Sequence, residues 1–154
     1  MKALNEIKSW LLMMQAARFW GMRKWDDGIA ILLKARKLTP KSDFILTLLG
    51  MTYYQMERYA EAKEVLMEAL ALSPNMGRLN HLMVNVLKKS SATVQDMIPY
   101  IKAALRNRSG GDAKSPWFAM MFPGSRERFR EMGDHEKEWE EWAEKVLLEY
   151  ESRK

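Results

Sequence analysis

The sequence has no cysteine among its 154 residues, and only two histidines, His81 and His135. The lack of cysteine excludes disulfide bonds, thiolate zinc sites, iron–sulfur clusters and cysteine nucleophiles. His81 has no carboxylate or second histidine three or four positions away, so no helical metal site or acid–base pair surrounds it. We therefore predict no metal, no cofactor and no catalytic residues, and hence a protein that is not an enzyme.

Long apolar runs are missing as well. The stretch from Trp10 to Met14 is too short for a signal sequence or a membrane span, and charged residues precede it. The composition, 47% hydrophobic and 29% charged, is typical of one globular unit. We expect a cytoplasmic protein with a single domain over residues 1–154.

The net charge of +5 is unevenly distributed. Residues 1–110 carry 17 Lys and Arg against 9 Asp and Glu, whereas residues 111–154 carry 8 against 11. A basic body is thus followed by an acidic tail. Excess positive charge attracts nucleic acid, anionic membrane surfaces or acidic proteins, and charge alone does not choose among them.

The sequence repeats itself with a period of about 34 residues. Residues 25–40 align with residues 59–74, so that Trp25 pairs with Tyr59 and Pro40 with Pro74. The preceding halves align too, with small residues at Gly50 and, one period earlier, an alanine. Small residues let two helices approach closely, and a proline ends each unit because it disfavours helix in the residue before it. Each unit is therefore predicted to be a helix, a turn and a second helix.

This period, with its small residues, its ring at the start of the second helix and its final proline, resembles the tetratricopeptide repeat (TPR) family. The resemblance implies an all-α solenoid of antiparallel helix pairs in a right-handed stack. Two repeats cover about 9–42 and 43–76, and a degenerate third covers 77–110. In that third unit Pro99 suggests a second helix that starts near Asp96 as N-cap. Residues 116–152 form either a distorted fourth repeat, broken at Pro123-Gly124 and aligned at Met132–His135 with the turn of the second, or capping helices.

The family's register places a binding groove on the first helix of each repeat. In the first repeat the groove residues would include Trp10, Met13 and Ala17, with Trp10 and Met13 alternatively covering the open end of the stack. The predicted groove residues are Trp20, Phe44, Thr47, Met51, Tyr54, Gln55, Arg78, His81, Asn85, Lys88 and Lys89. This groove is aromatic and Met-rich at one end and basic at the other. It suits a protein or peptide partner with an apolar anchor and an acidic flank, bound as an extended segment or as an amphipathic helix.

The resemblance implies a protein-interaction module, such as an adaptor, an assembly factor or a chaperone. Chaperone-binding TPR proteins hold a C-terminal carboxylate with polar and cationic side chains, but here Met13, Ala17, Leu48 and Leu82 occupy those positions and only Arg78 matches. Heat-shock chaperone tails are therefore disfavoured as partners. A cytosolic chaperone of type III secretion subunits is one alternative, and nucleic-acid or anionic-surface binding by the basic body is another. We favour a monomer capped by the C-terminal helix over a homodimer, because its glutamates supply the polar outer face that a solenoid end needs.

Overall fold

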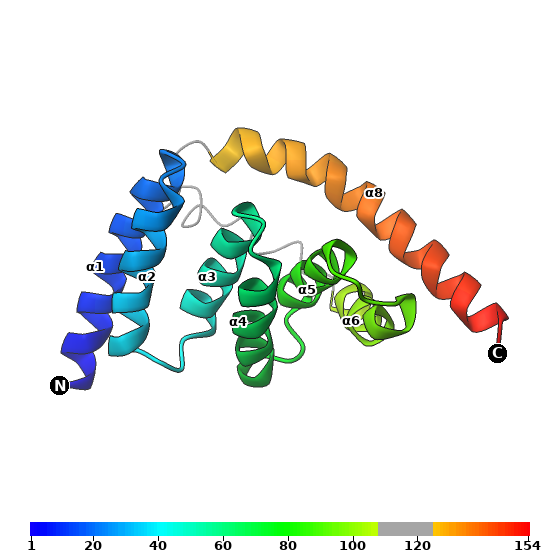
Figure 1. Ribbon diagram of the computed structural model, residues 1–154, viewed down its shortest axis with the longest axis horizontal. Helices are drawn as coiled ribbons and strands as arrows, with labels where there is room; N and C mark the ends of the chain where they lie inside the picture. Colours follow the sequence, from blue (N-terminus) through cyan, green and yellow to red (C-terminus); the bar gives the residue numbers. More distant parts are fainter. Residues whose placement is uncertain (108–124) are drawn as a thin grey trace. The chain divides into compact units, whose positions relative to one another are not determined.

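The computed structural model describes residues 1–107 and 125–154, and the side chains of residues 1–107 and 137–154. The described residues form seven α-helices (Figure 1). They are α1 (Lys2–Gly21), α2 (Trp25–Leu38), α3 (Asp43–Gln55), α4 (Tyr59–Leu72), α5 (Gly77–Lys89), α6 (Val94–Arg106) and α8 (Ser125–Ser152). The fold is all-α, with the helices packed as sequential antiparallel pairs, as predicted. The chain divides into two compact units, unit 1 (Met1–Pro74) and unit 2 (Asn75–Lys154).

Small residues lie where the two helices of a pair in unit 1 approach each other. Ala16 on α1 and Ala62 on α4 are buried. A Cβ atom built on Gly50 of α3 would lie 2.6 Å from Cδ2 of Leu66 on α4. Because real Cβ atoms do not approach other carbons so closely, only glycine fits between α3 and α4 as they now pack. The predicted role of the small residues is confirmed at these positions.

The turns inside the two pairs of unit 1 are built alike, at positions one repeat period apart. Arg23 and Glu57 have φ values of 56° and 58°, in the left-handed region. The next amide in each turn, of Lys24 or Arg58, donates a hydrogen bond of 2.9 Å to a carbonyl five residues earlier in the first helix. This is the geometry in which a left-handed residue ends a helix and satisfies its last carbonyl groups. Both repeats therefore reverse direction in the same way.

A side-chain hydrogen bond between the first helix of each pair and the end of the second helix also recurs after one period. The hydroxyl oxygens of Ser9 and Thr39 lie 2.7 Å apart, and Ser73 donates to Asp43 over 2.5 Å. Ser9 lies inside α1 and Asp43 is the first residue of α3, and each is bonded to the residue that follows the second helix of its pair. Together with the turns, these bonds show that the α1–α2 and α3–α4 pairs share the same local contacts at positions one period apart.

The α5–α6 helix pair keeps this register but closes by a different contact. Gly77 and Asn107 follow Asp43 and Ser73 by one period. Gly77 has no side chain to donate or accept, and a Cβ atom there would overlap the backbone carbonyl oxygen of Asn107. The first residue of α5 therefore packs directly on the chain that follows α6. The close backbone contact takes the place of the hydrogen bond.

The start of α6 differs from the prediction that Asp96 is the N-cap. The N-cap is Thr93, whose hydroxyl accepts from the amide of Asp96, while the Asp96 carboxylate accepts from the amide of Thr93 over 2.8 Å. This reciprocal capping box starts the helix three residues earlier than predicted. Pro99 consequently lies inside α6, on its exposed side, at the cost of one backbone hydrogen bond.

The C-terminal helix α8 is one uninterrupted element of 28 residues. It runs without a break through residues 132–135, where alignment with the second repeat would place a turn. The turn that this alignment predicts is therefore not found at residues 132–135, while the distorted repeat and the capping helices over 116–152 both remain predictions. Within unit 2, α8 packs on α6. The predicted break at Pro123-Gly124 and the rest of residues 108–124 lie outside the described residues.

Candidate protein-interaction surface

The first helices of unit 1 carry most of the predicted groove residues at partly accessible positions. Trp20 on α1 and Phe44, Met51 and Tyr54 on α3 are half-buried, and Gln55 is exposed. Half-buried rings and methionine sulfurs are held in place from one side and open to a ligand from the other. This mixture of rigid aromatic and adaptable thioether groups is favoured on protein-binding surfaces.

Two of these rings are locked by a neighbouring ring, again with the spacing of the repeat. Trp20 packs edge-on against Trp25 with 5.4 Å between centroids, and Tyr54 packs edge-on against Tyr59 at 5.6 Å. Burial and the adjacent Tyr59 raise the pKa of Tyr54, so its hydroxyl stays protonated and can donate a hydrogen bond. Each pair joins the end of a first helix to the start of the second, which fixes the ring before any ligand binds.

Some residues assigned by register are less accessible. Thr47 is buried, and its hydroxyl donates to the backbone carbonyl of Asp43 over 2.7 Å. Ala17 is buried as well, whereas Met13 is half-buried and Trp10 is 39% exposed. The structure thus places the Thr47 and Ala17 side chains in the helix packing, which is where short side chains on the inner faces of tightly packed helices belong.

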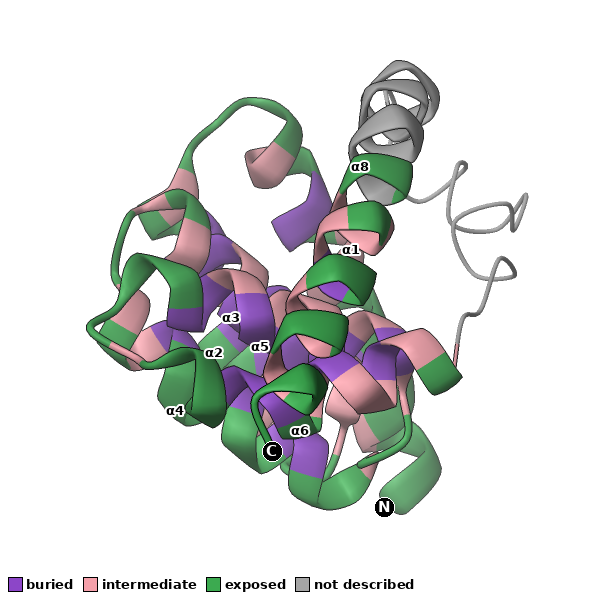
Figure 2. Cartoon of the chain, turned by 90° about the vertical axis from the view of Figure 1, so that its right-hand side faces the viewer, coloured by how far each residue is buried: buried purple, intermediate pink, exposed green. Residues whose placement is uncertain are grey.

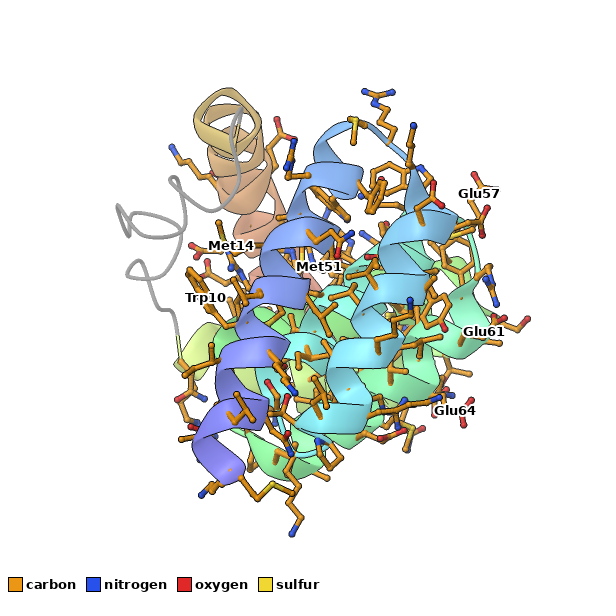
Figure 3. All side chains as sticks on the ribbon, turned by 90° about the vertical axis from the view of Figure 1, so that its left-hand side faces the viewer. Trp10, Met14, Met51, Glu57, Glu61 and Glu64 are labelled. Carbon is orange, nitrogen blue, oxygen red and sulfur yellow. The ribbon has the colours of Figure 1, made fainter. Side chains whose placement is uncertain are left out.

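Unit 1 has a different character along its second helices. In Figure 3, Trp10, Met14 and Met51 lie away from the edge where Glu57, Glu61 and Glu64 gather. Along this edge, within the repeat, Arg58 forms an ion pair of 2.8 Å with Glu61. Another ion pair, of 2.6 Å, joins Arg36 of α2 to Glu68 of α4. Arg36 on α2 and Arg58 just before α4 are therefore both paired with carboxylates of α4.

The predicted groove residues of unit 2 lie on α5, and three of them contact α8. The His81 ring stacks on Trp139 with 3.9 Å between centroids and an interplanar angle of 26°. Asn85 Oδ1 accepts a hydrogen bond of 3.1 Å from Trp139 Nε1. Lys88 Nζ lies 3.9 Å from the centroid of the Trp142 ring, within the range of a cation–π interaction. The chain's own C-terminal helix therefore covers this part of the predicted groove.

The electrostatics of His81 follow from this contact. Burial first, then the positive charges of Arg78 and Lys88, lower the pKa of His81 to about 4. A neutral imidazole stacks on the indole at neutral pH without the cost of burying a charge. Burial and the neighbouring Lys89 also lower the pKa of Lys88. Lys89 itself is exposed, and Arg78 is half-buried.

Sequence reasoning does not identify Trp139 and Trp142 as contacts of the groove residues. The available signal is their spacing of three positions, which puts both rings on one face of a helix together with Ala143. An apolar face of this kind favours the interpretation of a cap over apolar core. The face of α5 that contacts α8 is polar instead. A helix that only caps an apolar core does not explain this polarity.

Within residues 1–107 and 137–154, no group of three or more metal-ligating side chains comes together. In the part of the chain that is described, no helix combines the length and the apolar character that crossing a membrane requires.

Comparison with known proteins supports the repeat architecture. The family model of the tetratricopeptide repeat matches residues 45–76. No curated protein matches the sequence. Among solved structures, the first TPR of Spaghetti (RPAP3), bound to the HSP90 peptide SRMEEVD, is similar with a TM-score of 0.61 and 12% identity, over 80% of this chain and 94% of that one.

Two bacterial structures are similar as well. MamA from Desulfovibrio magneticus RS-1 has a TM-score of 0.59 and 15% identity, over 93% of this chain and 75% of that one. PilF from Pseudomonas aeruginosa has a TM-score of 0.59 and 18% identity, over 95% of this chain and 67% of that one. Since residues 45–76 match the family model and the helix pairs of unit 1 recur at the family's period, this chain carries the tetratricopeptide repeat.

Proposed function

We propose that the protein is a non-catalytic interaction module that binds a peptide or helix of a partner protein on the first helices of unit 1. The observation that carries this proposal is the row of half-buried aromatic and methionine side chains on α1 and α3, including Trp20, Met51 and Tyr54. The two rings are fixed in advance by Trp25 and Tyr59, so binding costs little side-chain entropy. An adaptor, an assembly factor or a chaperone would each use such a surface.

The chemistry of this surface favours a partner with an apolar anchor. Binding an acidic peptide, such as the one in the similar RPAP3 structure, requires cationic and amide groups on the first helices. Met13 and Leu48 stand at such positions here, and Leu48 is buried. We therefore propose a different ligand for this chain. A role as a chaperone of secretion subunits remains one version of the same proposal.

Binding of nucleic acid through the basic body has less support. A nucleic-acid surface needs cations gathered into one stripe. In unit 1, Arg36 on α2 and Arg58, which immediately precedes α4, are instead paired with Glu68 and Glu61.

Replacing two side chains of this surface with alanine tests the proposal. The double variant Met51→Ala, Tyr54→Ala should lose capture of the native partner from cell extract, because it removes the anchor contacts without opening the buried core. The matched control is Met67→Ala, Leu72→Ala, which removes two exposed apolar side chains from α4. Capture that survives in the first variant and is lost in the second would place the binding surface on the second helices and refute the proposal.

A further inference from the structure

The α8 helix meets α5 through groups that recognise a ligand rather than through groups that build a core. Trp139 and Trp142 lie one turn apart on α8, and their contacts on α5 are an imidazole, a side-chain amide and an ammonium group. Asn85 and Lys88 lie one period after Met51 and Tyr54 of the candidate surface in unit 1, and His81 lies one period after the buried Thr47. In unit 2 a helix of the same chain already binds there.

The described part of α8 is held by few buried groups. Of its side chains from residue 137 onward, only Ala143 is buried, and Leu148 is 69% exposed. On α5, by contrast, Leu79, Met83 and Val84 are fully buried. Figure 2 shows the same difference, since the coloured part of α8 is almost entirely exposed or intermediate. An element with so little buried apolar surface opens at a lower free energy than the α5–α6 pair.

Release of α8 would cost little helical structure. The sequence from Lys137 to Lys154 is rich in strong helix formers, and Glu141 precedes Lys145 by four positions, the orientation that stabilises an isolated helix. An external helix of similar sequence would likewise be ordered before binding. Exchange of one such helix for another is therefore a small step in conformational entropy.

The charges of the two surfaces are complementary. Residues 77–106 of α5 and α6 carry five Lys and Arg against one aspartate, whereas residues 137–154 carry six glutamates against four Lys and Arg. One ion pair of 3.2 Å, between Lys102 and Glu151, joins α6 to α8. The helix that occupies this surface, α8, thus combines aromatic anchor residues with flanking glutamates.

We propose that the α5 surface formed by His81, Asn85 and Lys88 is a docking site for an amphipathic helix that carries two aromatic side chains at positions i and i+3 flanked by glutamates. The α8 helix is its resident occupant, and a partner helix of this chemistry binds by displacing α8. The inference rests on the proposed function only in taking the partner to be a protein helix. It adds a second site, in unit 2, that the resting chain keeps covered.

The test uses a fluorescent peptide with the sequence of residues 137–154 and the full-length chain. The variant Trp139→Ala, Trp142→Ala removes the two anchors of α8 and should bind the peptide at least tenfold more tightly than the wild type, by fluorescence anisotropy. A peptide in which both tryptophans are alanine should not bind. The matched control Leu148→Ala changes an exposed residue of the same helix and should behave as the wild type.

A third substitution locates the site. Lys88→Glu, added to the tryptophan double variant, should weaken peptide binding at least fivefold, because it replaces the cation over the ring with a carboxylate. Circular dichroism melting confirms in each case that the α5–α6 pair is folded. If the double variant does not fold, the wild-type protein is used instead and is titrated with an excess of the peptide. The peptide should then displace α8, with an affinity that falls as the salt concentration rises.

Equal peptide affinity of the wild type and the double variant, or affinity unaffected by Lys88→Glu, would overturn the proposal. A wild-type dimer that becomes monomeric in the double variant would show that the occupant is a second copy, and would also overturn it. Capture of the native partner through Met51 and Tyr54 is a separate readout. Its loss or survival therefore distinguishes failure of the proposed function from failure of this inference.

Discussion

At the scale of single residues, the structure uses the same solutions at positions one repeat period apart. Arg23 and Glu57 both take left-handed φ values, and the edge-on ring pairs of Trp20 and Tyr54 recur with the same spacing. The sequence shows an aromatic residue at each of these positions, but it does not show that the rings pack against each other. The left-handed turns are not visible in the sequence, because glycine or asparagine is the usual signal and neither is present.

Glu57→Gly should stabilise the protein. A left-handed φ of 58° strains a residue with a Cβ atom, and glycine relieves the strain while losing more entropy on folding, for a net gain of about 0.5–1 kcal/mol. Urea unfolding measures the change. Glu64→Gly, on the exposed face of α4, is the control and should cost about 1 kcal/mol. Equal losses in both variants would contradict the assigned turn.

The His81 ring should make stability depend on pH. Its folded pKa, lowered to about 4, lies below the unfolded value near 6.5, so the unfolded chain takes up the proton first. The stabilisation is therefore complete above pH 6.5 and is lost as the pH falls toward 4. Between pH 7 and 4.5 the free energy of unfolding of the wild type should fall by about 2 kcal/mol more than that of His81→Gln. The variant is the control because its carboxylates titrate as those of the wild type do. Parallel curves for the two proteins would refute the stacked, neutral ring.

At the scale of elements, the sequence predicts the helix pairs. It predicts only some of the contacts that start, end and join these helices. The repeat period and the small residues at Gly50 and Ala62 predict the first two pairs, because close packing demands small side chains at fixed places. The start of α6 is predicted too late, since that prediction gives Pro99 more weight than the Thr93–Asp96 capping box. The docking of α8 joins residues 54 positions apart without any repeat spacing, so periodicity does not reveal it.

Gly77→Ala tests the register of the third pair. Its Cβ atom would overlap the Asn107 carbonyl oxygen, and a backbone group cannot rotate away, so the substitution should cost about 1–3 kcal/mol in thermal unfolding. The control is Gly28→Ala on α2, where the nearest atoms are 3.9 Å from the new Cβ atom. Alanine is a better helix former than glycine, so the free energy of unfolding of this variant should rise by about 0.5–1 kcal/mol. If Gly77→Ala is equally tolerated, the end of the third pair is assembled differently.

At the scale of the whole molecule, the proposed binding residues divide between the two units. Those of unit 1, such as Met51 and Tyr54, are half-buried on α3, whereas His81 and Asn85 of unit 2 lie under α8. The sequence predicts which helix faces carry them, because the register of the repeat assigns one face of each first helix. Which of them the chain itself covers depends on tertiary contacts of α8, and these have no signature in the period.

Site-specific photo-crosslinking tests the central claim most directly. Benzoylphenylalanine replaces either Gln55, exposed at the end of α3, or Met67, exposed on α4, and the protein is irradiated with the captured partner. The account predicts a covalent adduct with the partner from position 55 and none from position 67. An adduct from position 67 alone would place the partner on the second helices and contradict the account.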